Sequence, residues 1–185
     1  GSYSVTMQII NAIAMFAGAI ATAYQPSLQS AFSNKNNSLT RKICGKVLVA
    51  YHVIFCLSVC GMIFVVIPLV TYIEPSFAFD PLLVFEMTLY YYLWKHHSVC
   101  ASLISNSNTI PYTLSFIISS CLGVCLSVLF GGALGFGATG LMFGQIASQI
   151  VYNNWRWPYA LAKMLGTTYV GLLKSGLSRN GSERA

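Results

Sequence analysis

The chain has 185 residues, of which 56% are hydrophobic and only 8% are charged, and its mean hydropathy is +0.66. An average soluble domain carries about 25% charged residues, so this chain lacks the polar surface that would cover a globule in water. The net charge of +6 does not indicate a nucleic-acid partner, because the basic residues are scattered between apolar blocks and form no single stripe. The composition predicts an all-α membrane protein with several transmembrane helices.

Apolar segments long enough to cross a bilayer follow one another along the chain. A helix needs about twenty residues to cross roughly 30 Å of hydrocarbon. The second segment is longer than that and holds Pro68 near its far end, so we expect it to tilt or kink. Residues 1–157 are therefore expected to form a bundle of five spans. The predicted spans are residues 3–24, 45–73, 81–104, 111–130 and 134–152.

The basic residues predict the orientation of these spans. The connection between the first two spans carries four basic residues and no acid, which favours the cytoplasmic side: Lys35, Arg41, Lys42 and Lys46. The loop at 74–80 holds two acids and no base, which favours the opposite side. The N-terminus is thus expected outside and the C-terminus in the cytoplasm. Because the number of spans is odd, this arrangement is expected for part of a larger bundle.

The third predicted span carries charged and imidazole side chains, namely Glu86, Lys95, His96 and His97. A charge at a helix centre costs about 2.5 to 3.5 kcal/mol on insertion scales. At about 100° per residue, Glu86, Tyr90 and His97 share one face, which is the predicted wall of a polar cavity, while Lys95 points away from it. The alternative is that Glu86 lies near the outer interface and Lys95 reaches the inner one, leaving only the histidines buried. A proton relay between Glu86 and His97 is a further hypothesis.

Polar residues also recur in the fifth predicted span, where Gln145, Gln149 and Asn153 follow one another at four-residue spacing. Hydrogen bonds between helices and contact with a substrate explain such a stripe equally well. His52 in the second span is a similar polar residue among apolar ones, as are Gln8 and Asn11 in the first span. The chain holds three histidines, too few for the boxes of a di-metal oxidase, and no common nucleophile or phosphate-loop motif occurs. No catalytic residue, metal or cofactor is therefore expected, and the protein is not expected to be an enzyme.

The segment Y-N-N-W-R-W-P at 152–158 is typical of a membrane boundary. Indole rings and arginine side chains are favoured at the headgroup level of a bilayer. Trp155, Arg156 and Trp157 are therefore predicted interface anchors in contact with membrane lipid.

The tail at 158–185 keeps an apolar residue at every third or fourth position as far as Leu172, with Tyr169 among them. This spacing predicts a short helix that lies on the cytoplasmic face of the membrane, with Pro158 near its start.

Three stretches, taken together, resemble a known family. They are A-Y-Q-P-S-L-Q-S-A-F at 23–32, L-W-K-H-H-S-V-C-A-S-L-I-S-N-S-N-T-I-P-Y at 93–112, and G-Q-I-A-S-Q-I-V-Y-N-N-W-R-W-P at 144–158. They are similar to segments of the O-antigen and capsule polysaccharide flippases, within the multidrug, oligosaccharidyl-lipid and polysaccharide flippase superfamily. The five spans resemble the eighth to twelfth helices of such a protein, so the first half and one helix of the second half are missing.

The resemblance implies a multi-pass protein of the bacterial cytoplasmic (inner) membrane. It implies movement of a polyprenyl-diphosphate-linked oligosaccharide to the outer leaflet, for O-antigen lipopolysaccharide or capsule synthesis, with a missing N-terminal half or a second chain completing the path. A diphosphate needs cationic and hydrogen-bonding groups. The candidates are Lys95, His96, His97, Gln145 and Gln149.

Two alternatives stay open. A cation-coupled multidrug antiporter of the same superfamily would use an intramembrane carboxylate, for which Glu86 and Asp80 are the candidates. A truncated or accessory membrane protein would not transport and would pack through its glycine-rich faces against a partner.

Overall fold

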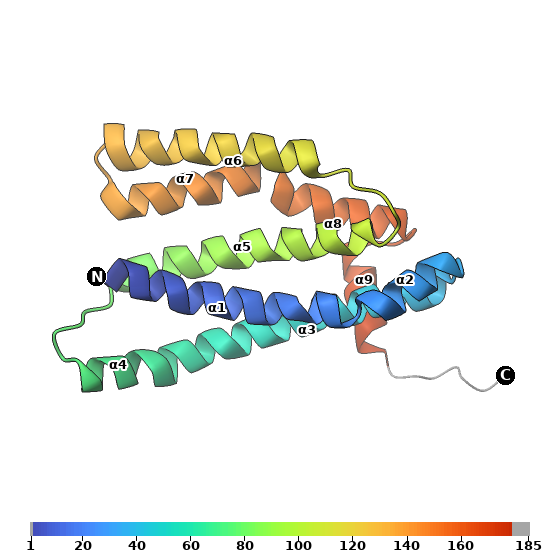
Figure 1. Cartoon of the computed structure of the whole chain (residues 1–185), viewed down its shortest axis with the longest axis horizontal. Coiled ribbons are helices and arrows are strands. Elements are labelled where there is room, and N and C mark those ends of the chain that lie inside the picture. Colours follow the sequence, from blue (N-terminus) through green and yellow to red (C-terminus); the bar gives the residue numbers. More distant parts are fainter. Residues whose placement is uncertain (1, 179–185) are drawn as a thin grey trace.

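The computed structural model describes residues 2–178, which form helices and short connections without any β-strand. The long helices lie along one common direction, and those that follow each other in the chain are antiparallel (Figure 1). Helices α1 and α3 pack together, α5 packs on α1, α7 packs on α5, and α6 packs on α7. The helix α9 crosses this bundle on the side of α3 (Figure 1). The predicted all-α class is confirmed.

The first hairpin consists of α1 (Ser2–Ala23), α2 (Gln25–Ser33) and α3 (Asn37–Gly61). Pro26 stands in the first turn of α2, where its missing N–H has no helical partner to lose. The side chain of Asn36 accepts a hydrogen bond from the Leu39 N–H and so caps α3.

The helix is expected to break near Pro68, and in the structure it changes there from an α-helix to a π-helix and back. The π-helical segment η1 (Met62–Val66) lies between α3 and α4 (Ile67–Ile73) and ends two residues before the proline. Proline has no N–H to offer the preceding turn, and a π-helical turn is one way to absorb that loss.

The next helices are α5 (Pro81–Ser105), α6 (Thr113–Ser127) with the π-helical segment η2 (Val128–Ala133), and α7 (Gly137–Val151). Asp80 caps α5 by accepting from the backbone N–H groups of Leu82 and Leu83. The helices α6 and α7 approach closely at Gly144, where an added Cβ would lie 2.5 Å from the Ser127 nitrogen.

Three helical stretches are long and apolar enough to cross a membrane: Tyr3–Ser33, Asn37–Ile73 and Thr113–Ala133. The other two predicted spans also form helices, α5 and α7, but neither reaches that standard. The helix α5 carries Glu86 and Lys95, and α7 has only 15 residues. These three helices indicate a membrane protein. That α5 and α7 also cross the membrane stays a prediction.

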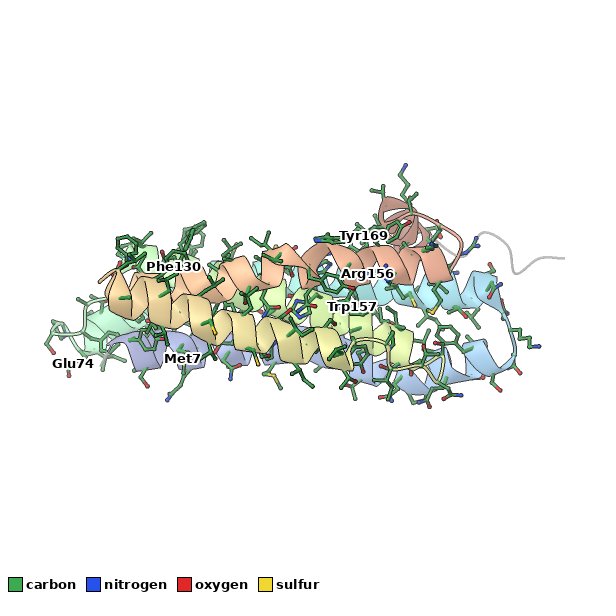
Figure 2. The ribbon with its side chains drawn as sticks, turned by 90° about the horizontal axis from the view of Figure 1, so that it is seen from above. Met7, Glu74, Phe130, Arg156, Trp157 and Tyr169 are labelled. Carbon is green, nitrogen blue, oxygen red and sulfur yellow. The ribbon has the colours of Figure 1, made fainter. Side chains whose placement is uncertain are left out.

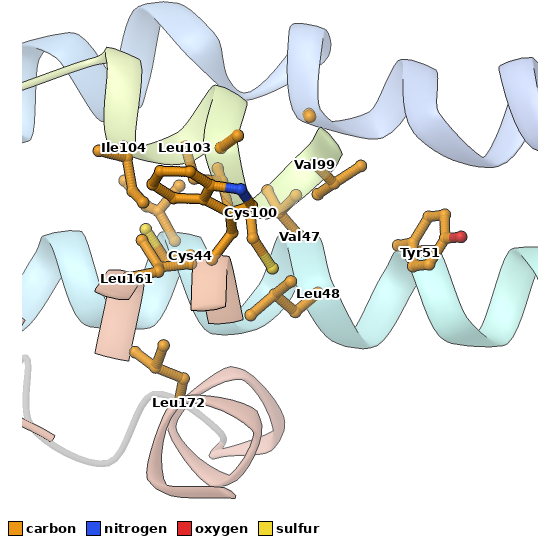
Figure 3. Packing of buried hydrophobic residues seen from close by; sticks show 14 of the residues in the cluster. Cys44, Val47, Leu48, Tyr51, Val99, Cys100, Leu103, Ile104, Leu161 and Leu172 are labelled. Carbon is orange, nitrogen blue, oxygen red and sulfur yellow. The ribbon is translucent and has the colours of Figure 1, made fainter. Parts of the chain in front are cut away.

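The C-terminal part differs from the expected single interfacial helix. It forms α8 (Asn153–Met164) and α9 (Tyr169–Leu177), and Pro158 lies inside α8. The expected boundary at 157/158 falls within α8, because this helix is an integral part of the bundle. Leu161 and Leu172 belong to the same buried cluster as Cys44 of α3 (Figure 3). The last predicted tail residues, 179–185, lie outside the described residues.

Candidate functional site: a histidine and tyrosine cluster between α3, α5 and α9

Arg41 fixes the turn that leads into α9. Its Nε donates to the Leu165 carbonyl oxygen at 2.5 Å, and its Nη2 donates to the Gly166 carbonyl oxygen at 3.3 Å. Gly166 has a φ of +63°, which favours glycine, directly after the end of α8. A guanidinium at a helix C-terminus also meets the negative end of the helix dipole. Arg41 therefore ties the start of α3 to the α8–α9 turn.

Two glycines then allow α9 to lie directly on α3. A Cβ added to Gly45 would lie 2.1 Å from the Leu172 carbonyl oxygen and 2.6 Å from the Gly176 nitrogen. The helices thus meet backbone to backbone, and Leu172 is completely buried. This close approach holds the first residue of α9, Tyr169, over the middle of α3 and α5.

The Tyr169 hydroxyl links two histidines. It lies 2.9 Å from Nε2 of His52 on α3 and 2.7 Å from Nε2 of His96 on α5. On the other side of His52, its Nδ1 lies 3.0 Å from the Tyr92 hydroxyl. We call these four residues, Tyr92, His52, Tyr169 and His96, the histidine cluster. They come from three helices and form one continuous chain of hydrogen bonds.

Aromatic packing surrounds the histidine cluster. The rings of His52 and His96 lie 5.2 Å apart between centroids, and Tyr92 stacks on His96 at 6.1 Å. Buried Tyr51 donates its hydroxyl to the Tyr92 backbone carbonyl at 2.8 Å. Burial, reinforced by Cys100 and Tyr92 nearby, raises the pKa of Tyr169. The bridging phenol therefore stays neutral and keeps its proton for hydrogen bonding.

A cavity of about 380 Å³ opens beside the histidine cluster, between α5, α8 and the α8–α9 turn. The cluster and this cavity therefore lie toward the end of the molecule where Tyr169 is found, away from Glu74 at the opposite end (Figure 2). The wall combines hydrogen-bonding groups with aromatic rings, and the cavity gives access to the cluster from outside. Its lining includes His96, Asn154, Trp155, Tyr159, Thr168 and Tyr169.

His97, beside His96 in the sequence, lies in a different environment. It is buried, its Nδ1 lies 3.0 Å from the Leu93 carbonyl oxygen and 3.2 Å from Oδ1 of Asn154, and its ring meets Phe116 edge-on. Both oxygen partners are acceptors, so Nδ1 carries the proton. His97 therefore packs against α6 and α8, while His96 faces α3 and α9.

Glu86 and His97 face the same side of α5, as their spacing predicts. Glu86 lies beside the Thr139 side chain on α7, and His97 meets Asn154 on α8. They are, however, about three helical turns apart along α5, so they do not touch. Tyr90 is half-buried beside Tyr91. Lys95 lies elsewhere, with Nζ 3.5 Å from Sδ of Met15 on α1.

The glutamines of α7 are bonded inside the bundle. Gln145 donates to the Ser127 hydroxyl on α6 at 3.1 Å. Gln149 accepts from Asn153 at 3.1 Å, and Asn153 in turn accepts from the Trp157 ring N–H at 2.9 Å. We call Gln149, Asn153 and Trp157 the amide ladder. It spans the break between α7 and α8 and lies in the interior.

The predicted interface anchors divide between surface and core. Trp155 is 56% exposed, and Arg156 donates to the Tyr152 hydroxyl at 3.2 Å. Trp157 is only 3% exposed and packs against Tyr112 and Phe116. The prediction that Trp157 contacts headgroups is wrong, because its ring fills the core and its N–H serves the amide ladder.

Three members of the histidine cluster were not among the predicted site residues. His52 is one of several polar residues in apolar spans, Tyr169 counts among the apolar positions of the tail, and no pattern in the sequence singles out Tyr92. A histidine isolated in a lipid-crossing helix is the signal that indicates a polar partner nearby.

The cluster offers hydrogen bonding and proton exchange. Within residues 2–178, no group of three or more His, Cys, Asp or Glu is arranged to hold a metal ion. Comparison of the chain with protein-family models, with curated proteins and with solved structures gives no match.

Proposed function

We propose that the chain is the C-terminal part of a flippase that moves a polyprenyl-diphosphate-linked oligosaccharide across the bacterial inner membrane. The observation that carries this proposal is the broken helix at Tyr152. Here α7 ends at Val151 and α8 begins at Asn153, with Tyr152 at φ −138° and ψ −55°. The break lies beside buried His97, through Asn154. Discontinuous helices with polar groups inside the bundle are typical of substrate sites in transporters.

The amide nitrogen of Asn154 supports the same proposal. It is buried and has no hydrogen-bond partner in the part of the chain that the structure describes. Such a donor beside a histidine suits an anionic oxygen, since each unpaired buried polar group costs about 1 to 3 kcal/mol. A closed path for a lipid-linked glycan needs more helices than this chain has, and we propose that an N-terminal half or a second chain supplies them.

Photochemical labelling tests the proposal on the whole chain. The chain is placed in phosphatidylethanolamine and phosphatidylglycerol vesicles with a photoreactive polyprenyl-diphosphate oligosaccharide. We expect unlabelled polyprenyl diphosphate to compete about tenfold better than polyprenyl monophosphate, as one more charge-assisted hydrogen bond would give. His97→Ala should reduce labelling, and the exposed Tyr159→Phe should leave it unchanged. Equal competition by both lipids would contradict the proposal.

A cation-coupled antiporter is the second candidate, and one observation favours it. Oε2 of Glu86 is buried without a hydrogen-bond partner among residues 2–178, and an intramembrane carboxylate of this kind can bind a cation. Ethidium binding separates the two candidates. If ethidium binds the wild-type chain in a Na⁺- or pH-dependent way, if Glu86→Gln removes that binding, and if diphosphate-lipid labelling is absent, the antiporter is favoured.

A further inference from the structure

The histidine cluster contains four hydrogen-bonding groups and no charge. Three contacts of 2.7 to 3.0 Å join Tyr92 to His52, His52 to Tyr169, and Tyr169 to His96. Each neutral imidazole has one N–H and one acceptor nitrogen, and each phenol has one O–H and can also accept. The number of protons in the cluster therefore decides which contacts are true hydrogen bonds.

Within residues 2–178, no carboxylate faces the cluster that would pair with a histidinium. The titratable groups that face the cluster are thiols, phenols and one imidazole. Arg41 and Lys163, at the same end of the bundle, are directed to the Leu165 carbonyl oxygen and to the Tyr159 ring. The facing groups are Tyr51 and Cys56 from α3, and His97 and Cys100 from α5, and the Cys100 Sγ lies 3.9 Å from Nε2 of His96, where it is a much weaker partner than the Tyr169 hydroxyl.

The neutral cluster has two complete proton arrangements. In the first, Tyr92 donates to His52, His52 donates to Tyr169, and Tyr169 donates to His96. In the second, every donor and acceptor is reversed, and His96 donates to Tyr169. Both arrangements make all three hydrogen bonds, because the bridging phenol accepts on one side while it donates on the other.

One added proton keeps all three hydrogen bonds. A charged His52 donates to both Tyr92 and Tyr169, and Tyr169 still donates to neutral His96. A charged His96 is accommodated by the second arrangement, with the extra proton on its Nδ1. A second proton would make both imidazoles donate to Tyr169, so that the Tyr169 hydroxyl could no longer donate to either ring and the sharing through it would end. The two cations would also lie 5.2 Å apart and repel each other.

We propose that His52, Tyr169 and His96 together form a binding site for a single proton, which is shared through the Tyr169 hydroxyl and exchanged through the cavity beside α8. His96 and Tyr169 line that cavity. At the other end, Tyr92 borders a groove lined by apolar side chains such as Phe55 and Leu89, so the proton enters and leaves at the cavity end. This site is independent of the proposed function, because it needs neither a lipid-linked glycan nor further helices.

Nitrogen NMR tests the proposal by counting protons. The full chain is labelled with ¹⁵N-histidine, placed in phosphatidylcholine and phosphatidylglycerol nanodiscs, and titrated from pH 8 to pH 4. The His52→Asn and His96→Asn variants assign the signals. We expect His52 and His96 to change together in one step that takes up one proton for the pair. The second proton should bind more than about one pH unit lower, as for strongly coupled groups.

Tyr169→Phe removes the bridge and keeps the ring. We expect the first protonation to move to lower pH, because the cation loses a charge-assisted hydrogen bond. Tyr72→Phe makes the same chemical change at an exposed position on α4, at the other end of the bundle (Figure 1), and its titration should match the wild type. The proposal is overturned if His52 and His96 each take up a full proton independently in the wild type, or if Tyr169→Phe titrates like the wild type. Should Tyr169→Phe fail to fold, the wild-type proton count alone decides.

Discussion

Helix α5 carries polar side chains at two levels along its length, near His96 and His97 and near Glu86. The two levels differ in whether these side chains find hydrogen-bond partners. Toward its C-terminal end, His96 is bonded to Tyr169, and His97 to Leu93 and Asn154. Toward its N-terminal end, Oε2 of Glu86 is buried without a partner among the described residues. At the first level, neutral partners come from α8, from α9 and from the Leu93 carbonyl of α5 itself.

The largest expected effect on stability comes from the amide ladder, which lies at the level of α5 where the polar groups have hydrogen-bond partners. Asn153→Ala leaves the Gln149 oxygen and the Trp157 N–H buried without partners, which should cost about 2 to 4 kcal/mol of unfolding free energy. Asn154→Ala is the matched control, since the Asn154 amide nitrogen has no partner to lose and His97 keeps its bond to Leu93. Thermal unfolding in detergent measures both variants. Equal losses would show that the ladder is not the stabilising feature.

The next effect tests how tightly α9 is seated. Gly45→Ala forces a Cβ against the Leu172 carbonyl, so we expect a loss of about 1 to 3 kcal/mol and faster proteolysis in the α8–α9 turn. Gly61→Ala, at the other end of the same helix, meets nothing within 4 Å and should stabilise the chain by about 0.5 to 1 kcal/mol. Opposite signs are therefore expected from the same substitution. A stabilising Gly45→Ala would mean that α9 does not lie on α3.

A smaller effect on stability is expected at the level of Glu86, whose Oε2 has no hydrogen-bond partner among the described residues. Glu86→Gln keeps the size and shape of the side chain and removes the charge from this half-buried carboxylate. We expect the unfolding free energy to rise by less than about 1 kcal/mol, because a carboxylate oxygen that loses its water without gaining a hydrogen bond is costly. A loss as large as that of Asn153→Ala would show that Glu86 is paired, and the contrast between the two levels would fail.

The smallest effect is a spectroscopic one. In vesicles that contain brominated lipid, exposed Trp155 should be quenched more strongly than buried Trp157. Single-tryptophan chains, with the other two tryptophans changed to Phe, give the comparison. Stronger quenching of Trp157 would contradict its place in the core.

The sequence predicts where most helices lie along the chain, but it does not predict which helices pack against one another. Apolar length and Pro68 predict the long helices and the break near residue 68, because these are local properties of the chain. The same length rule overstates α7, whose helix ends at Val151 after 15 residues. No local signal in the sequence indicated that α9 would lie on α3, because that contact depends on Gly45 and Gly176, far apart in the chain.

The candidate site was predicted only in part for the same reason. His96 was named because a histidine is conspicuous in an apolar helix. Tyr169 was counted as apolar, because helical periodicity registers the ring and not the hydroxyl. Its partners His52 and His96 precede it by 117 and 73 residues, so only the folded chain shows that they meet. Likewise, composition places two tryptophans at a boundary and cannot tell that Trp157 turns inward.

The most direct test of this account is the contact between Tyr169 and the two histidines in a lipid bilayer. Magic-angle-spinning NMR on the chain with ¹³C-labelled tyrosine and histidine measures it. We predict cross-peaks from the Tyr169 ring to both His52 and His96, which disappear in Tyr169→Phe. A Tyr169 ring with cross-peaks to lipid and none to either histidine would show that α9 lies free on the membrane surface, and the histidine cluster would not exist.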